Sequence, residues 1–221
     1  MHRDPEGKEK QVITELLGSS TGDLFEIGCG DGRLTRELAA LFGTLTALDP
    51  ELPSVMAARV DLLGRTKFLA GSGEDLPLVD DCADTVIFSL SLHHQDSVKA
   101  LEEARRVLRE NGHILVLEPV EHSLLTMLFA VLHDESEEYE KAETAIDLSG
   151  LKELRSGSVK TSWVFEDFAE MKNYMFDYFS LESDLEREKD MAKLLGERRY
   201  LKPLHIEDIT RFWLLREGPD S

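Results

Sequence analysis

The chain has 221 residues, 42% hydrophobic and 31% charged, and its 44 acidic against 25 basic residues give a formal net charge of -19. Such an acidic surface repels phosphate backbones and anionic membranes, so the composition argues against nucleic-acid and membrane partners. Two cysteines, no signal-peptide pattern and no apolar run near the ~20 residues of a membrane span predict a soluble, cytoplasmic protein without a disulfide framework.

Short apolar runs alternate with amphipathic helical segments over residues 7–120. Strands are predicted at residues 24–27, 45–48, 67–70, 85–90 and 114–117, and helices at about 12–17, 34–41, 52–63 and 98–108, the last closed by Asn111 and Gly112. Strands that are apolar on both faces and alternate with helices are typical of a parallel sheet covered on both sides. We therefore predict a doubly wound α/β fold.

The regular alternation ends after Pro119. The pattern there predicts helices at 122–132, 134–143 and 185–199, strands at 159–165 and 209–215, and a helical stripe made of Phe168, Met171, Met175 and Phe179. The apolar run at 124–132 and this stripe would either wall a pocket for an apolar ligand or form core.

A glycine-rich turn, EIGCGDG, follows the first strand, from Glu26 to Gly32. Glycines allow a sharp turn and let backbone N–H groups approach a ligand closely. A dinucleotide fingerprint needs a third glycine at position 33, which is Arg33, so the spacing argues against NAD and FAD. Asp49 ends the next strand, where a carboxylate can accept from both hydroxyls of a ribose. Together these features predict a nucleoside ligand without a 5′ phosphate, and S-adenosylmethionine is such a ligand.

Five segments, in this order, resemble the motifs of class I S-adenosylmethionine-dependent methyltransferases, above all the small-molecule subgroup that includes the quinone-biosynthesis enzymes. They are LFEIGCGDGRLT, LTALDPE, LAGSGEDLPL, DTVIFSLSLHH and RRVLRENGHILVLEP, and they cover about residues 22–119. The resemblance implies a Rossmann-like seven-stranded doubly wound sheet with a helical elaboration after the fifth strand. Its last strand, residues 209–215, would run antiparallel.

The resemblance also implies how a single domain, residues 1–221, would be organised. Residues 7–120 would form the cofactor-binding core, residues 121–203 a variable, helical region on the substrate side, and residues 204–221 the last strand and tail. The expected reaction transfers the methyl group of S-adenosylmethionine to O, N or C of a small-molecule acceptor and releases S-adenosylhomocysteine.

Carried over by position, the resemblance implies a cofactor site with the following members: Glu26, Gly28, Cys29, Gly30, Asp49, Pro50, Gly73, Glu74 and Ser89. The loop glycines would line the methionine part, and Glu26 would orient the loop or meet the ammonium group through water. Asp49 would hold the ribose, while Gly73 and Glu74 would border the adenine. Ser72 stands where the family usually has an aspartate that accepts from the adenine amino group, so this contact is not predicted.

His93 and His94 follow the fourth strand, whose C-terminal end faces the ligand crevice in folds of this kind. An imidazole titrates near neutral pH, so either ring would suit a base acting on a hydroxyl, an enol or an acidic carbon. A direct substrate contact and a packing role are the alternatives. The spacing of His, Cys and carboxylate residues predicts no metal site.

Three other functions stay open at this point. The first is a non-catalytic S-adenosylmethionine-binding regulator, which lack of methyl transfer to any acceptor would distinguish. The second is a protein methyltransferase acting on a basic partner, which the charge of -19 would suit and strong salt dependence would favour. The third is a nucleotide-dependent oxidoreductase, which the spacing at Arg33 contradicts.

Overall fold

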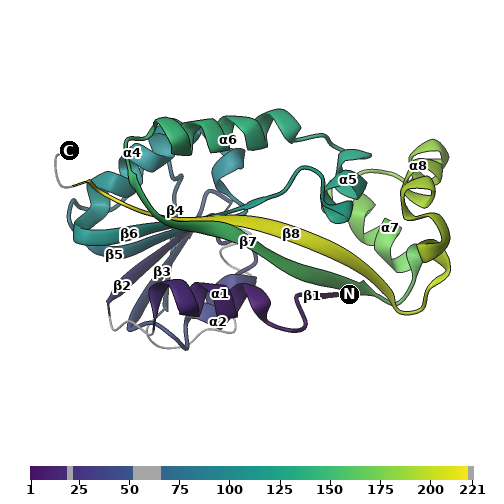
Figure 1. Ribbon diagram of the computed structural model, residues 1–221, viewed down its shortest axis with the longest axis horizontal. Helices are drawn as coiled ribbons and strands as arrows, with labels where there is room; N and C mark the ends of the chain where they lie inside the picture. Colours follow the sequence, from purple (N-terminus) through teal and green to yellow (C-terminus); the bar gives the residue numbers. More distant parts are fainter. Residues whose placement is uncertain (19–21, 52–65, 219–221) are drawn as a thin grey trace. The chain divides into compact units, whose positions relative to one another are not determined.

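The computed structural model describes residues 1–18, 22–51 and 66–218, which form two compact units (Figure 1). One unit comprises Lys10–Glu118, Glu140–Gly157 and the residues from Arg211 onward; it holds all five motifs, and we call it the motif unit. The other comprises Met1–Glu9, Pro119–Tyr139 and Ser158–Thr210, and we call it the aromatic unit after its core. The helix predicted at 52–63 lies outside the described residues.

Five parallel strands form the centre of the motif unit. They are β2 (Asp23–Ile27), β3 (Thr44–Asp49), β4 (Thr66–Ala70), β5 (Ala83–Ser89) and β6 (Leu108–Pro119). Their pairing gives the order β4-β3-β2-β5-β6. The chain adds strands outward on one side from β2 to β4 and then on the other side from β5 to β6, so the topological switch point lies between β2 and β5, beside the glycine-rich turn. A crevice at such a switch point is where doubly wound sheets bind ligands.

Helices cover both faces of this sheet, with α4 (Ser97–Val107) and α6 (Ser136–Leu148) on one face and α1 (Lys8–Leu17) and α2 (Arg33–Leu38) on the other (Figure 1). Successive side chains of a strand point to opposite faces of the sheet. In β5, Phe88 therefore packs in the hydrophobic cluster under α4 and α6, and Ile87 packs in the cluster under α1 and α2. The predicted doubly wound α/β fold is confirmed.

Within the part of the chain that the structure describes, the sheet has eight strands instead of the predicted seven. The full order is β1-β7-β8-β6-β5-β2-β3-β4, in which β7 (Lys152–Phe165) and β8 (Leu204–Arg216) are longer than the apolar patterns indicated. The additional strand β1 (His2–Arg3) pairs antiparallel with Trp163 and Val164 of β7. A strand of two residues is too short to show any periodicity, so β1 could not be predicted from the apolar pattern.

The predicted boundary between α4 and the fifth strand is wrong. The helix ends at Val107, and Leu108 already belongs to β6, so Asn111 and Gly112 lie inside a strand and do not close a helix. Leu108 continues the helical spacing of apolar residues, but it pairs with Ala83 of β5, where the register shifts. Asn111 takes a φ of 66° in this irregular stretch, which asparagine tolerates better than most residues.

The aromatic unit contains α5 (Leu124–Ala130), α7 (Phe168–Tyr178), α8 (Leu185–Leu195), the short η2 (Gly196–Tyr200) and parts of β7 and β8. Met171 and Met175 of the predicted stripe are fully buried, so the stripe forms core, with Phe168 and Phe179 packed partly buried against it. Asp167 and Asp184 begin α7 and α8 by accepting hydrogen bonds from first-turn N–H groups.

A buried carboxyl, Asp208, lies in the aromatic unit. Its Oδ2 accepts from Nε1 of Trp163 at 3.2 Å, and the guanidinium of Arg3 lies 5.2 Å from the centroid of that Trp ring. Burial raises the pKa of Asp208, and the charge of Arg3 offsets part of that effect. Among the described residues, no helix is long and apolar enough to cross a membrane.

Candidate active site

Backbone geometry shapes the turn between β2 and α2. Gly28, Gly30 and Gly32 have φ values of 77°, 51° and 76°, a region that L side chains avoid. A Cβ on Gly28 would lie 2.3 Å from Cβ of Ser91, whereas a Cβ on Gly30 would meet nothing within 4 Å. Gly28 is therefore required by packing, and Gly30 leaves one side of the loop open to an approaching group.

Asp49 connects the end of β3 to this loop. Its Oδ2 accepts from the N–H of Gly30 at 2.8 Å, and its Oδ1 accepts from the N–H of Glu51 at 2.9 Å. A carboxylate has about four acceptor positions, so these two donors leave capacity for hydroxyl groups. The sequence predicted both the loop and the acid, and the structure shows that they bond to each other. Pro50, next in the chain, is exposed.

Two side chains of the loop are buried beneath it. Glu26 is 1% exposed, and its Oε2 accepts from Oγ1 of Thr35 on α2 at 2.5 Å, which ties the end of β2 to the following helix. Burial, followed by the charges of Glu26 and Asp49, raises the pKa of the Cys29 thiol to about 12. The thiol is therefore protonated at neutral pH and has little nucleophilic character.

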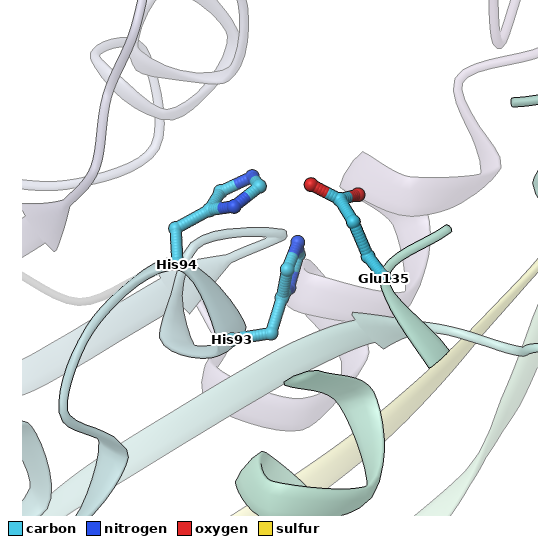
Figure 2. Close-up of side chains that lie close together, drawn as sticks. All are labelled: His93, His94 and Glu135. Atoms are coloured by element: carbon cyan, nitrogen blue, oxygen red, sulfur yellow. The ribbon is translucent and has the colours of Figure 1, made fainter. Parts of the chain in front are cut away.

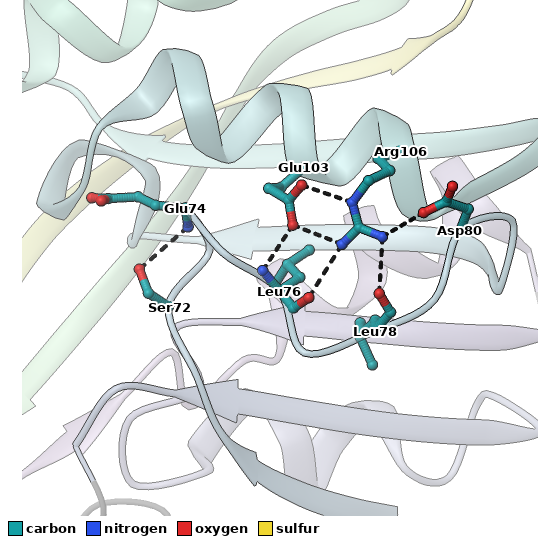
Figure 3. A network of polar contacts seen from close by, with 7 residues as sticks. All are labelled: Ser72, Glu74, Leu76, Leu78, Asp80, Glu103 and Arg106. Atoms are coloured by element: carbon teal, nitrogen blue, oxygen red, sulfur yellow. Dashed lines mark hydrogen bonds and ion pairs between the residues drawn. The ribbon is translucent and has the colours of Figure 1, made fainter.

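The turn after β4 carries the residues predicted to border an adenine (Figure 3). Oγ of Ser72 accepts from the N–H of Glu74 at 3.2 Å, and Oε1 of Glu74 accepts from the N–H of Asp96 at 2.7 Å, at the start of α4. A Cβ on Gly73 would lie 2.2 Å from Oε1 of Gln95, so this side chain packs directly on the glycine. Glu74 thus joins this turn to the start of α4.

The histidines lie on η1 (Leu92–His94), the short turn that follows β5 (Figure 2). Their ring centroids are 3.9 Å apart, but His93 is 5% exposed whereas His94 is exposed. Nδ1 of His93 contacts Oε2 of Glu118 at the end of β6, and Oε1 of Glu118 accepts from the N–H of Leu92 at 3.0 Å. One buried carboxylate therefore fixes both the ring and the backbone of this turn.

The start of this turn is strained. Ser89 ends β5 half-buried, and Leu90 follows with a φ of 54°, which is unusual for a residue other than glycine. The N–H of Leu90 donates to the carbonyl of Leu117 at 2.8 Å, and Oγ of Ser91 donates to the carbonyl of Ile27 at 2.6 Å. Backbone strain of about 1–3 kcal/mol per residue persists where the surroundings fix it, often at functional sites.

Known proteins resemble the segment that contains these features. Residues 25–116 match the family described as methyltransferase domain. An uncharacterized methyltransferase of Mycobacterium tuberculosis is 31% identical over 104 residues, 47% of this chain and 42% of the relative. A ubiquinone/menaquinone biosynthesis C-methyltransferase of Sinorhizobium fredii is 30% identical over 118 residues, 52% of this chain and 44% of the relative. The chain therefore matches less than half the length of either relative.

Solved structures extend the likeness in fold to nearly the whole chain. The YcgJ protein of Bacillus subtilis superposes with a TM-score of 0.65 at 15% identity, covering 95% of this chain and 98% of that one. A geranyl diphosphate methyltransferase in complex with S-adenosylmethionine gives 0.62 at 13% identity, covering 96% and 86%. Residues 25–116 of this chain therefore resemble methyltransferase domains, and the fold of nearly the whole chain is shared with solved methyltransferases.

Within the motif unit, Arg106 was missed by sequence reasoning although it lies inside a quoted motif (Figure 3). Its guanidinium donates to both carboxylate oxygens of Glu103 at 2.7 Å, to Asp80 at 2.7 Å, and to the carbonyls of Leu76 and Leu78 at 3.2 and 2.9 Å. The guanidinium in turn lowers the pKa of Glu103. Arg106 thereby fastens the turn after β4 onto α4.

Glu118 is the second residue of the motif unit that sequence reasoning missed. The signal was the same as for Asp49, an acid at the end of an apolar strand, and the segment ending LVLEP had been quoted without a role for its glutamate. What the sequence could not show is that β5 and β6 are parallel neighbours, with Ser89 opposite Leu117. That pairing brings Glu118 to the histidine turn.

Proposed function

We propose that the protein binds S-adenosylmethionine in the motif unit and transfers its methyl group to O, N or C of a small-molecule acceptor, releasing S-adenosylhomocysteine. The observation that carries this proposal is the hydrogen bond from Gly30 to Asp49, which joins the glycine loop to the acid of the next strand. The match of residues 25–116 to methyltransferase domains supports it, as does the fold shared with a protein solved with this cofactor.

In this proposal the loop at Gly28, Cys29 and Gly30 lines the methionine part of the cofactor, and Glu26 beneath it holds the loop on α2. The remaining acceptor positions of Asp49 take the ribose hydroxyls. The other proposed cofactor contacts are Pro50, Gly73, Glu74 and Ser89. Ser72 replaces the usual aspartate with a hydroxyl that already accepts from the N–H of Glu74.

The protein has little covalent chemistry to supply, because a methyl group on a sulfonium is already electrophilic. Its task is to align the acceptor atom behind the methyl carbon and to keep water away. The relative named as a ubiquinone/menaquinone biosynthesis C-methyltransferase supports a small acceptor, and the net charge of -19 gives no support to a polyanionic one.

The test is calorimetric titration of the full chain with S-adenosylmethionine and S-adenosylhomocysteine. Wild type is expected to bind both, and Asp49→Asn to bind them about 10-fold to 100-fold more weakly, because hydrogen bonds to a charged acceptor are lost. Asp147→Asn, which removes the same charge from an exposed position on α6, is the matched control and should bind as wild type does. A folded wild type that binds neither compound would overturn the proposal.

Methyl transfer separates an enzyme from a regulator that only binds the cofactor. Cofactor labelled on its methyl group is incubated with hydroxyl-bearing, amine and acidic-carbon acceptors, and transfer to one class is expected. Binding without transfer to any of them would favour the non-catalytic alternative.

A further inference from the structure

Gln95 connects η1 to the turn that follows β4. It lies between η1 and α4, and its backbone N–H donates to the carbonyl of Leu92 at 3.3 Å. Nε2 of its side chain donates to the carbonyl of Ser91 at 2.9 Å. Because a carbonyl only accepts hydrogen bonds, the amide group presents its nitrogen to Ser91 and its oxygen, Oε1, to the other side. The orientation of the side chain is therefore fixed.

Oε1 of Gln95 faces the turn after β4. A Cβ on Gly73 would lie 2.2 Å from this oxygen and 2.9 Å from Cγ2 of Ile27, at the end of β2. The glycine thus lets the oxygen lie directly against the backbone of the turn. The Gln95 side chain is half-buried, and among the residues that the structure describes Oε1 accepts no hydrogen bond. Polar atoms withdrawn from water normally have a partner, so this oxygen is an acceptor with unused capacity.

Two polar side chains of the turn itself are already engaged. Oγ of Ser72 accepts from the N–H of Glu74, and Oε1 of Glu74 accepts from the N–H of Asp96. The first contact closes the turn on its own backbone, and the second ties it to the start of α4. The amide oxygen of Gln95 differs from both, because the opposite atom of its amide group holds it in place.

The position of this acceptor bears on the base of a nucleoside. The N–H of Gly71, at the start of the turn, donates to the carbonyl of Asp49 at 3.2 Å, so the turn begins beside the residue proposed to hold the ribose. A base attached to that ribose reaches the turn at Gly73, which is one of the proposed cofactor contacts. Adenine carries an amino group, a hydrogen-bond donor, at C6 of its ring. A 6-oxopurine carries a carbonyl oxygen there.

We propose that Oε1 of Gln95 accepts a hydrogen bond from the 6-amino group of the cofactor's adenine and makes the site selective for a 6-aminopurine over a 6-oxopurine. This inference rests on the proposed function, because it needs a cofactor bound at Asp49. A carbonyl at C6 would bring two acceptors together and leave Oε1 without a donor, which lowers affinity about 10-fold to 100-fold. Gln95 thereby supplies an adenine contact in a chain that has Ser72 at the usual aspartate.

The selectivity is tested by calorimetry on the full chain with S-adenosylhomocysteine and with S-inosylhomocysteine, which carries the 6-oxopurine. Wild type should bind the first compound about 10-fold to 100-fold more tightly. Gln95→Met keeps the length of the side chain and removes the amide, so the two dissociation constants should become nearly equal. Gln11→Met, at an exposed glutamine on α1, is the matched control and should keep the wild-type ratio.

A second measurement uses wild type alone and does not depend on how a variant folds. Gln11 and Gln95 are the two glutamines of the chain, so protein labelled at glutamine gives two side-chain signals in NMR spectra. In the complex with S-adenosylhomocysteine, the adenine amino protons should show a nuclear Overhauser contact with the γ-protons of Gln95. The γ-protons of Gln11 should show none.

The outcomes separate this inference from the proposed function. If Gln95→Met weakens binding of both compounds equally, so that their ratio is unchanged, Gln95 only braces the turn after β4 and the assignment is wrong. Equal affinities of wild type for the two compounds, or a complex without the Overhauser contact, would overturn the assignment too, and the proposed function would stand in each case. A wild type that binds neither S-adenosylmethionine nor S-adenosylhomocysteine would instead remove the proposed function, and the adenine contact with it.

Discussion

Both compact units bury polar groups, Asp208 among them in the aromatic unit, but they concentrate different kinds of side chain. The motif unit buries charged and polar groups at the ends of its parallel strands, each bonded to a neighbouring element, as Glu26, Asp49 and Glu118 show. The aromatic unit buries methionines and aromatic rings, with Phe129 lying 5.4–6.0 Å between centroids from three other rings. A carboxylate contact fixes an atom within tenths of an ångström, whereas a methionine core adapts its shape. The strand ends of the motif unit are therefore suited to precise positioning.

The largest expected effect tests whether precision in the motif unit depends on packing at the loop. Gly28→Ala should destabilise the fold by about 4 kcal/mol, since left-handed strain adds to the overlap with Ser91, and should abolish cofactor binding. Gly30→Ala adds strain without overlap, so it should cost only about 1 kcal/mol in stability while still weakening binding. Denaturant unfolding and calorimetry measure both. Equal stability losses would mean that packing does not distinguish the two glycines.

A core substitution in the aromatic unit should separate stability from cofactor affinity. Met175 is fully buried, so Met175→Ala should lower the free energy of unfolding by about 3 kcal/mol through the lost contacts and the cavity. The dissociation constant for S-adenosylhomocysteine should stay at the wild-type value, because every proposed cofactor contact lies in the other unit. A large fall in affinity in the still-folded variant would contradict the division of labour between the units.

A smaller effect is expected at Arg106, which acts on the site only through the turn it holds. Arg106→Lys keeps the charge but loses the planar fork, so it should cost about 1 kcal/mol and weaken cofactor binding a few-fold. Arg105→Lys is the matched control, because Arg105 bonds to Ser149 and Glu217 and not to the turn after β4. If calorimetry shows that both variants bind the cofactor as tightly as wild type does, the turn after β4 needs no support from Arg106.

The smallest effect is expected at Asp208, the carboxyl described above as buried in the aromatic unit. Burial raises the pKa of Asp208, so the folded protein holds a proton that the unfolded chain has already released, and stability is lost as pH rises toward the folded pKa. Asp208→Asn keeps an acceptor for Trp163 and removes this loss. Thermal unfolding should show a small gain in Tm at pH 8 that disappears near pH 4. A decrease at pH 8 would mean that attraction to Arg3 outweighs burial.

The sequence predicted those parts of the molecule that short-range patterns encode. The strands of the motif unit, the loop at Gly28 and the acid at Asp49 follow from apolar runs and from residues with special backbone freedom. The contacts of Glu118 with His93 and of Arg106 with Leu76 join residues that lie 25 and 30 positions apart, and only strand pairing and helix packing bring them together. The aromatic unit shows the same limit, since the stripe at Met171 and Met175 indicated a helix without showing what it would pack against.

The protonated state of Cys29 has a consequence for the protein's durability. With a thiol pKa of about 12, about one molecule in 10⁵ carries a thiolate there at pH 7. A thiolate is the nucleophile that would attack an alkylating sulfonium, and the proposed cofactor is such a reagent, held against the very loop that contains this cysteine. Burial of Cys29, reinforced by the carboxylates of Glu26 and Asp49, would thus let a sulfur atom lie beside the proposed electrophilic cofactor without becoming S-methylcysteine.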